Sequence, residues 1–407
     1  MANLNPHLEK LSSYYFFKDI DQRTAALMER QPQALLLNLG IGDITKPLAP
    51  HLLAALCTAS QEMGDKKTFR GYGPSQGYPF LQEAILYGDY HRLGISIDEI
   101  FISNGAKCDL ANIQEIFAPD CKIGMCDPSY PVFIDTNVMA GRTLAWSEEK
   151  GGYEGIVTVP CLEENNFLPL PPSAPCDLIY LCSPNNPTGV ALTRKVLKMW
   201  IDYALQHNCI LLYDGAYEAY ISSEDCPRSI YEMEGAREVA IEIRSFSKSA
   251  GFTGLRCSYS IIPKNLRAKL NGKDVSIHSI WRRRQDMKFG GVPYPIQKCA
   301  AAMYSPEGQT ELKEMIQVYK ERARFLYDGL KSIGFTVYGG MDAPYVWCKT
   351  PSGRTSWEFF DHLLEKAHII SIPGKGFGKM GEGYVRFSAF ADPQILAESL
   401  LRIKQMG

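Results

Sequence analysis

Short apolar, β-rich runs alternate with helical patterns through the middle of this 407-residue chain, and no other sequence feature limits the fold as strongly. The strand-helix pairs are 100–103 with 106–117, 122–126 with 130–140, and 178–182 with 193–206; further strand-like runs follow at 210–213, 239–243 and 257–262. Such alternation is typical of a mainly parallel sheet covered by helices on both faces. We therefore expect an α/β fold whose ligand site lies beyond the carboxyl ends of the strands.

The pattern changes after residue 291. A long helical stretch at 306–332 is followed by strand-like runs at 344–348, 368–372 and 384–387, which indicates a second, α+β domain. At about 150 residues per domain, the length allows two to three domains. We predict an N-terminal arm with part of the small domain at 1–44, a large domain at 45–290 and a C-terminal small domain at 291–407.

Composition excludes several classes of protein. The 43 basic and 45 acidic residues give a net charge of −2, with no block of like charge, so we expect no nucleic-acid partner. The longest apolar runs, such as 209–213, are far shorter than the roughly 18 residues that cross a bilayer, so we expect no membrane association. The start does not resemble a secretory signal. Twelve scattered cysteines, without a CxxC pair or a Cys/His cluster, favour free core thiols, no metal site and a cytoplasmic location.

A lysine follows one of the strand-like runs. Lys248 ends the sequence Ser-Phe-Ser-Lys that begins at Ser245, and Arg256 follows eight residues later. Burial lowers the pKa of an amine, and the neutral amine attacks carbonyl groups. The neighbouring Ser245, Ser247 and Arg256 are suitable phosphate ligands. Taken alone, however, a lysine in a serine-rich turn is more often a solvated loop residue.

An aspartate follows the preceding strand-like run, 210–213. Asp214 comes directly after 210–213, and Tyr217 lies three residues further on. A carboxylate at the end of a buried strand needs a cation or several hydrogen-bond donors, and a protonated ring nitrogen would be such a cation. Tyr217 can reach the same ligand. An aspartate that caps the following helix explains this segment equally well.

Two further segments place polar groups after strand-like runs, and a third places an arginine inside one. In 183–189 (Ser-Pro-Asn-Asn-Pro-Thr-Gly), two prolines and a glycine favour a rigid turn that presents Asn186, although an ordinary tight turn has the same composition. The 103–107 turn offers backbone amides to an anion. Arg386 lies between apolar neighbours, which suggests a bidentate carboxylate ligand, with a solvated strand face as the alternative.

Each of these five segments is a weak signal alone, but their order and spacing together form a specific pattern. Asn186 precedes Asp214 by 28 residues, and Asp214 precedes Lys248 by 34. The series S-P-N-N-P-T-G, D-x-x-Y, S-F-S-K and G-x-x-G-x-R resembles the class I/II aminotransferases of fold type I, which use pyridoxal 5′-phosphate (PLP). The resemblance covers essentially the whole chain. It implies a large domain with a mainly parallel seven-stranded sheet, a smaller α+β domain, and an amino acid and a 2-oxo acid as substrates.

The resemblance also implies roles for individual residues. Lys248 would bind the cofactor covalently and shuttle the proton, and Asp214 would keep the ring nitrogen protonated. Tyr217 and Asn186 would contact the phenolic oxygen of the ring. Tyr130 would stack on the ring. The phosphate would be held by Ser245, Ser247, Arg256 and the amides of Ala106 and Lys107. Tyr72 from the other subunit would also reach the phosphate, which implies a homodimer with shared active sites. The substrate would contact Tyr15, Gly42, Lys107, Tyr130, Asn186 and Arg386.

Within the superfamily, the chain is most similar to the LL-diaminopimelate aminotransferase family. The similar stretches are 15–20, 38–43, 70–74, 105–107 and 251–254. The resemblance implies transamination between LL-diaminopimelate/tetrahydrodipicolinate and glutamate/2-oxoglutarate, in the synthesis of lysine and peptidoglycan precursors. Two positions depart from the family pattern: Ser75 replaces an acidic residue that faces the distal ammonium of the substrate across the dimer interface, and Gly290 replaces an asparagine.

These departures leave two alternatives open. One is a related aminotransferase for another amino acid, such as lysine, an aromatic residue or another long side chain. The other is a PLP-dependent lyase or synthase, because the same cofactor scaffold serves those reactions.

Overall fold

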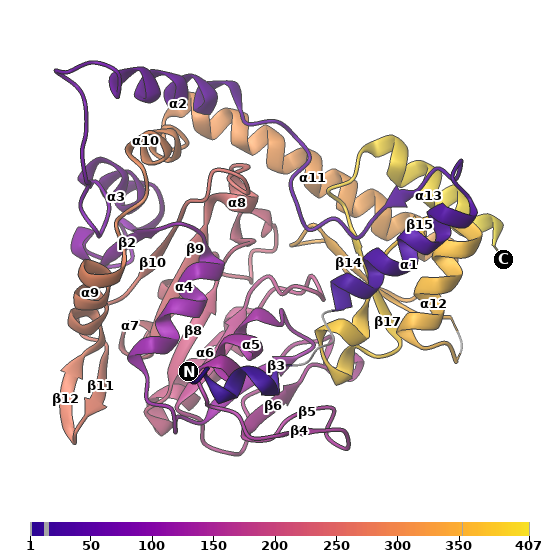
Figure 1. Ribbon diagram of the computed structural model, residues 1–407, viewed down its shortest axis with the longest axis horizontal. Helices are drawn as coiled ribbons and strands as arrows, with labels where there is room; N and C mark the ends of the chain where they lie inside the picture. Colours follow the sequence, from indigo (N-terminus) through magenta and orange to yellow (C-terminus); the bar gives the residue numbers. More distant parts are fainter. Residues whose placement is uncertain (1, 12–15, 352, 407) are drawn as a thin grey trace.

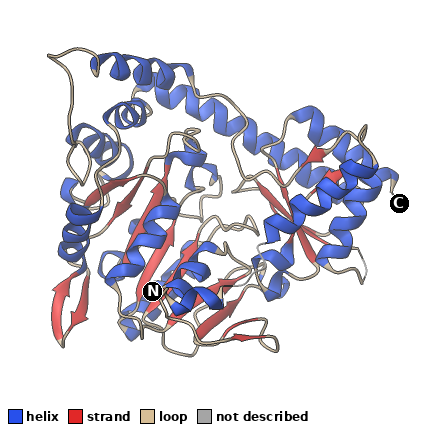
Figure 2. Ribbon diagram, in the orientation of Figure 1, coloured by secondary structure: helices blue, strands red, loops and turns tan. Residues whose placement is uncertain are grey.

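A seven-stranded sheet forms the centre of the protein, in a computed structural model that describes residues 2–11, 16–351 and 353–406 (Figures 1 and 2). The strand order is β2-β10-β9-β8-β7-β3-β6. β10 runs antiparallel to both neighbours, and the other adjacent strands are parallel. The expected mainly parallel α/β fold is confirmed. The strands are β2 (Ile100–Ser103), β3 (Ile123–Asp127), β6 (Ile156–Pro160), β7 (Leu178–Cys182), β8 (Ile210–Asp214), β9 (Ala240–Ser245) and β10 (Ser258–Ile261).

Successive strand residues point to opposite sides of this sheet, and residues on both sides are buried. Ile179 and Leu211 pack with α6 (Arg194–His207), whereas Leu178 and Ile210 pack on the opposite face. That opposite face is covered by α4 (Ala106–Asn112), α5 (Val132–Met139) and α9 (Ile277–Lys288). The two short helices beside the sheet are α7 (Ala236–Val239) and α8 (Phe246–Ser249). Because Asp214 and Ser245 continue the alternation of the α4/α5 face, their side chains lie on that side at the carboxyl edge.

A smaller antiparallel sheet, in the order β13-β14-β17-β16, lies in the C-terminal part of the chain. Its strands are β13 (Val337–Gly339), β14 (Tyr345–Lys349), β16 (Ile372–Pro373) and β17 (Tyr384–Ser388). The expected single strand at 368–372 is divided: β15 (Ile369–Ile370) instead pairs in parallel with β1 (Leu37–Asn38). The N-terminal segment therefore joins the C-terminal part. The helices in this region are α1 (Phe16–Arg30), α12 (Ser356–His362) and α13 (Pro393–Gln405).

Long helices connect the two sheets. α2 (Pro50–Glu62) packs against α10 (Tyr294–Ala302), and α11 (Pro306–Ser332) runs from these helices to the C-terminal sheet (Figure 1). α10 also packs on α3 (Pro79–Ile85), beside the central sheet, although it follows residue 291 in sequence. The domain boundary at 291 stays a prediction. Two small hairpins complete the fold: β4 (Trp146–Ser147) with β5 (Gly152–Tyr153), and β11 (Arg267–Leu270) with β12 (Lys273–Ser276).

Carboxylates join the two sheet regions. Asp127, at the end of β3, accepts hydrogen bonds of 3.0 Å from the backbone N–H groups of Lys379 and Met380. Asp342, beyond β13, accepts a hydrogen bond of 2.7 Å from the Ser223 hydroxyl. These contacts hold the C-terminal sheet against the carboxyl edge of the central sheet, where the polar side chains gather.

Two further observations concern the cysteines and the possibility of a membrane-spanning helix. All twelve cysteines carry free thiols, and nine are buried, which confirms the expected free core thiols. Within 2–11, 16–351 and 353–406, none of the helices has the length and apolar character needed to span a membrane.

Candidate active site

A cavity of about 380 Å³ lies at the carboxyl edge of the central sheet, between that sheet and the N- and C-terminal segments. Strand ends β8 and β9, helix α8 and the first residues of α4 form one side, and β17 with the 40–43 segment forms the other. The structure brings twelve of the fourteen predicted site residues together in its wall. They are Gly42, Ala106, Lys107, Tyr130, Asn186, Asp214, Tyr217, Ser245, Ser247, Lys248, Arg256 and Arg386.

The other two predicted residues are not placed in this wall. The side chain of Tyr72 is fully exposed and does not line the cavity of its own chain. Its contact with the cofactor of a partner subunit stays a prediction. Tyr15 lies outside the described residues.

Lys248 projects into the cavity from α8, the short helix that directly follows β9. Its Nζ donates a hydrogen bond to the carbonyl oxygen of Gly42 and lies 3.9 Å from Asp43 Oδ1. Burial lowers the pKa of the Lys248 amine from 10.5 to about 8; the Asp43 charge opposes this shift, and the positive charges of Arg386 and Arg256 add to it. The amine is therefore neutral in an appreciable fraction of molecules near neutral pH, as a nucleophile or base requires.

Asp214 lies at the end of β8 and is 6% exposed. Its carboxylate accepts hydrogen bonds of 2.8 Å from the Tyr180 hydroxyl and 3.0 Å from the Ala216 N–H. Burial raises the pKa of Asp214, while these two hydrogen bonds oppose that effect. None of the described cationic side chains forms an ion pair with Asp214. A buried carboxylate in this position favours a cationic ligand.

A cluster of hydrogen-bond donors around Arg256 forms another part of the cavity wall. The Arg256 guanidinium lies 3.4 Å from Ser247 Oγ, and Ser247 N–H donates to Ser245 Oγ over 3.1 Å. Gly105 adopts φ +127°, and a Cβ there would lie 2.0 Å from Arg256 Nη2. The glycine thus permits the guanidinium to approach the turn before α4. Hydroxyls, a guanidinium and this turn together suit a phosphate group.

Arg386 lies on β17 across the cavity and is 3% exposed. Its guanidinium donates hydrogen bonds of 2.7 Å to Asn186 Oδ1 and 3.0 Å to the Gly40 carbonyl, and it lies 4.3 Å from the centre of the Tyr345 ring. Its Nε has no partner among the described residues, none of whose carboxylates forms an ion pair with Arg386. A buried guanidinium with a spare donor suits the carboxylate of a substrate.

Sequence reasoning missed two tyrosines in the cavity wall. Tyr180 contacts Asp214, and the Tyr345 hydroxyl lies 2.8 Å from the Tyr217 hydroxyl. Burial raises the pKa of Tyr217 well above 10, so its hydroxyl keeps its proton. Both missed tyrosines lie in apolar strands, where they resemble core residues. Other wall residues that were not predicted are Phe17, Gly40, Asp43, Leu110, Cys182, Ala216 and Thr253.

The arrangement fits PLP from end to end. The donor cluster suits its phosphate, the buried carboxylate of Asp214 suits a protonated pyridine nitrogen, and the Lys248 amine suits its aldehyde. Arg386 is then available to the carboxylate of an amino acid. In the described parts of the chain, no group of three or more His, Cys, Asp or Glu side chains is placed to hold a metal ion.

The fold and this cavity define a class of enzyme, and the sequence comparison agrees. The family model "Aminotransferase class I and II" matches residues 35–398, and the chain belongs to that family. It is accordingly an aminotransferase that uses PLP. The predicted fold type and family are confirmed.

Solved structures give more detailed similarities. The chain is 42% identical to the L,L-diaminopimelate aminotransferase from Chlamydomonas reinhardtii, with a TM-score of 0.93 and coverage of 100% of this chain and 98% of that one. Substrate-bound BacF from Bacillus subtilis is 28% identical, with a TM-score of 0.83 and coverage of 100% and 98%. A Thermus thermophilus aspartate aminotransferase mutant is 21% identical, with a TM-score of 0.83 over the full length of both chains, and shares the fold.

Proposed function

We propose that the protein is an LL-diaminopimelate aminotransferase that works as a cytoplasmic homodimer, with glutamate and 2-oxoglutarate as the second substrate pair. The observation that carries the catalytic part is the convergence of Lys248, Asp214 and Arg386 on one cavity. The substrate is supported by the 42% identity to the Chlamydomonas reinhardtii enzyme over the full length. The fully exposed Tyr72 supports a dimer, and twelve free thiols support a reducing compartment.

Bound PLP supplies an aldehyde for the substrate amino group and a protonated ring that withdraws charge from Cα. Asp214 would hold the proton on the ring nitrogen, and the Tyr217 hydroxyl would contact the phenolic oxygen. Arg386 binds the α-carboxylate and orients the Cα–H bond toward Lys248. The Lys248 amine would take the proton from Cα of the substrate and pass it to C4′, the former aldehyde carbon of the cofactor.

The rate at which PLP binds the apoprotein covalently provides a test of the Lys248 role. Because the pKa of Lys248 is about 8 and only the neutral amine attacks an aldehyde, we expect this rate to increase about tenfold from pH 7 to pH 9. The neutral fraction rises as pH passes through the pKa and then levels off. Stopped-flow absorbance measures the rate. A rate that is constant over this range contradicts the assignment.

A carboxylate lies beside Ser75, the residue that replaces the acidic residue of the family pattern. The Ser75 hydroxyl donates a hydrogen bond to Asp286, which is exposed near the end of α9. Gly291 adopts φ +84°, and a Cβ there would lie only 3.2 Å from the carbonyl oxygen of Pro74. The loop that carries Tyr72 and Ser75 therefore packs closely on the segment after α9. We propose that Asp286 supplies the negative charge for the distal ammonium of a substrate in the partner's site.

Replacement of Asp286 by asparagine is expected to reduce the preference for LL-diaminopimelate about 10- to 100-fold, since a charge-assisted hydrogen bond contributes about 1.5–3 kcal/mol. The comparison substrate is L-2-aminopimelate, which has both carboxylates but no distal amine. Half-reaction rates of the wild type and of Asp286→Asn with both substrates give the preference as a ratio.

A matched control is Glu115→Gln. Glu115 accepts hydrogen bonds of 3.0 Å from Arg284 and Lys288, so this variant disturbs the same helix and leaves Asp286 in place. We expect it to keep the wild-type preference. An equal loss in both variants means that the helix, and not the Asp286 charge, sets the preference.

The substrate proposal itself is tested by the decay of the cofactor absorbance in wild-type holoenzyme. LL-diaminopimelate, lysine, glutamate and an aromatic amino acid are compared in single half-reactions. We expect LL-diaminopimelate to react faster than lysine and the aromatic amino acid. If lysine reacts as fast, the substrate proposal fails, whereas membership of the aminotransferase family is unaffected.

A further inference from the structure

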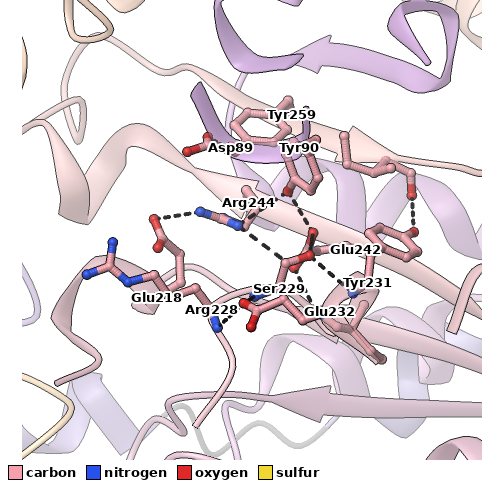
Figure 3. A network of polar contacts seen from close by, with 12 residues as sticks. Asp89, Tyr90, Glu218, Arg228, Ser229, Tyr231, Glu232, Glu242, Arg244 and Tyr259 are labelled. Atoms are coloured by element: carbon pink, nitrogen blue, oxygen red, sulfur yellow. Dashed lines mark hydrogen bonds and ion pairs between the residues drawn. The ribbon is translucent and has the colours of Figure 1, made fainter. Parts of the chain in front are cut away.

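A buried network of charged and hydroxyl groups lies behind the cavity, on the opposite face of β9 (Figure 3). At its centre, Arg244 Nη2 lies 2.8 Å from Glu218 Oε1; the Arg244 side chain is 6% exposed and that of Glu218 is 16% exposed. Arg244 immediately precedes Ser245 in β9, and Glu218 immediately follows Tyr217. Because neighbouring strand residues point to opposite faces, Arg244 lies behind the strand end that carries Ser245.

The ion pair joins the two segments that carry the catalytic groups. Gly215 N–H donates to the Ile243 carbonyl over 2.9 Å, and the Tyr220 hydroxyl donates to the Lys248 carbonyl over 3.0 Å. A Cβ on Gly215 would lie 3.0 Å from Arg244 Cδ, so the aliphatic part of the arginine packs directly on this backbone. An ion pair, two hydrogen bonds and the packing at Gly215 thus fix the 214–220 segment to the 243–248 segment.

The other side of the Arg244 guanidinium contacts Tyr90 and Glu242. Its Nη1 lies 3.3 Å from the Tyr90 hydroxyl and 3.9 Å from Glu242 Oε1. Glu242 is fully buried and accepts hydrogen bonds of 2.6 Å from Tyr90 and 2.9 Å from Ser229. Burial tends to lower the pKa of Arg244, but the Glu218 carboxylate and neighbouring groups raise it well above its ordinary value. Arg244 therefore remains charged and in one place.

We propose that Arg244 and Glu218 are positioning residues that set the Tyr217 hydroxyl relative to the Lys248 amine. This inference rests on the proposed roles of Tyr217 and Lys248 in the bound cofactor site. Neither Arg244 nor Glu218 lines the cavity, so they act through the segments that they connect. A displacement of about 1 Å in reacting groups costs on the order of 100-fold in rate. Loss of the ion pair is therefore expected to affect turnover more than substrate binding.

The test uses Glu218→Gln, which keeps the size and a hydrogen-bond acceptor but removes the charge, and Arg244→Lys, which keeps a charge but loses the two-pronged donor. We expect each to lower kcat of the half-reaction about 10- to 100-fold, with KM changed less than about threefold. The visible absorbance of the holoenzyme changes with pH, and we expect the midpoint of that change to shift in each variant as well. That spectroscopic readout is independent of turnover.

The matched control is Glu99→Gln. Glu99 is also a buried carboxylate, 3.2 Å from the guanidinium of Arg237, but it lies at the amino end of β2, away from the cavity. Urea unfolding of each apoprotein shows how much stability each variant loses. We expect Glu99→Gln and Glu218→Gln to lose comparable stability, whereas only Glu218→Gln changes kcat and the absorbance midpoint.

The outcomes separate this inference from the proposed function. If Glu218→Gln and Arg244→Lys lose stability but keep the wild-type kcat and absorbance midpoint, the pair is only structural and the inference is wrong. If one variant does not fold, the other decides by the same criteria. Peptide mapping of borohydride-treated wild type tests the proposed function separately: without an adduct at Lys248, that function fails regardless of the variants.

Discussion

Replacement of Lys248 by alanine is expected to lower the transamination rate by about 10,000-fold or more, since one positioned acid-base group contributes about 100- to 10,000-fold and this residue also forms the covalent link. Borohydride treatment of the variant is expected to give no cofactor adduct at position 248. Binding of PLP is expected to weaken without disappearing, because the donor cluster around Arg256 and the carboxylate of Asp214 remain.

Two further variants make this result specific. Lys248→Arg keeps a positive charge but has no amine that can attack the aldehyde, so we expect it to be inactive too. Lys320→Ala removes another lysine whose pKa is lowered by burial; its Nζ contacts the Ile221 carbonyl over 3.4 Å and does not line the cavity. We expect this control to retain activity. A Lys248→Ala protein that turns over at a rate near that of the wild type would mean that another group is the nucleophile.

The central strands could be predicted from the sequence because they are buried on both faces. β7 and β8 read as nearly continuous apolar runs, which is typical of parallel strands covered by helices. β6 was not predicted: it is an edge strand with partly exposed residues, and its pattern is weaker. The direction of β10 was also not predictable, since periodicity does not distinguish parallel from antiparallel pairing.

The β11-β12 hairpin was missed although it carries a local signal. Its strands are polar and largely exposed, so they lack an apolar pattern. Its turn, however, is Asn271-Gly272, with φ values of 51° and 78°. Asn-Gly is the preferred sequence for a two-residue hairpin turn that needs positive φ at both positions. The turn residues therefore provided better evidence than the strands.

Most of the candidate site could be predicted because its residues follow strand ends, and parallel strands end at one edge of a sheet. Tyr180 could have been found from register: Cys182 pairs with Asp214, and Tyr180 lies two residues earlier on the same face. Tyr345 could not, because it comes from the other sheet and meets Tyr217 only after the two parts of the chain pack together. The substitution at Ser75 likewise acquires a neighbour, Asp286, only in the folded chain.

Replacement of Arg386 by alanine is expected to lower kcat/KM for amino-acid substrates about 150- to 5,000-fold. The reason is that loss of one partner from a buried ion pair costs about 3–5 kcal/mol, and in the proposed complex the substrate carboxylate would be left without its buried guanidinium. Most of the effect is expected in KM, because the carboxylate is bound in both the ground state and the transition state. Half-reaction rates measured against amino-acid concentration give kcat and KM separately.

Arg322→Ala is a suitable control, because Arg322 also has a buried Nε without a partner among the described residues. It donates hydrogen bonds of 3.3 and 3.0 Å to the carbonyls of Phe390 and Ala391, but it does not line the cavity. We expect this control to lose stability and keep its KM. A simple amine without a carboxylate provides a second comparison, since its slow reaction should be insensitive to Arg386→Ala. If Arg386→Ala slows the amine and the amino acid equally, Arg386 supports the cavity wall and does not bind the carboxylate.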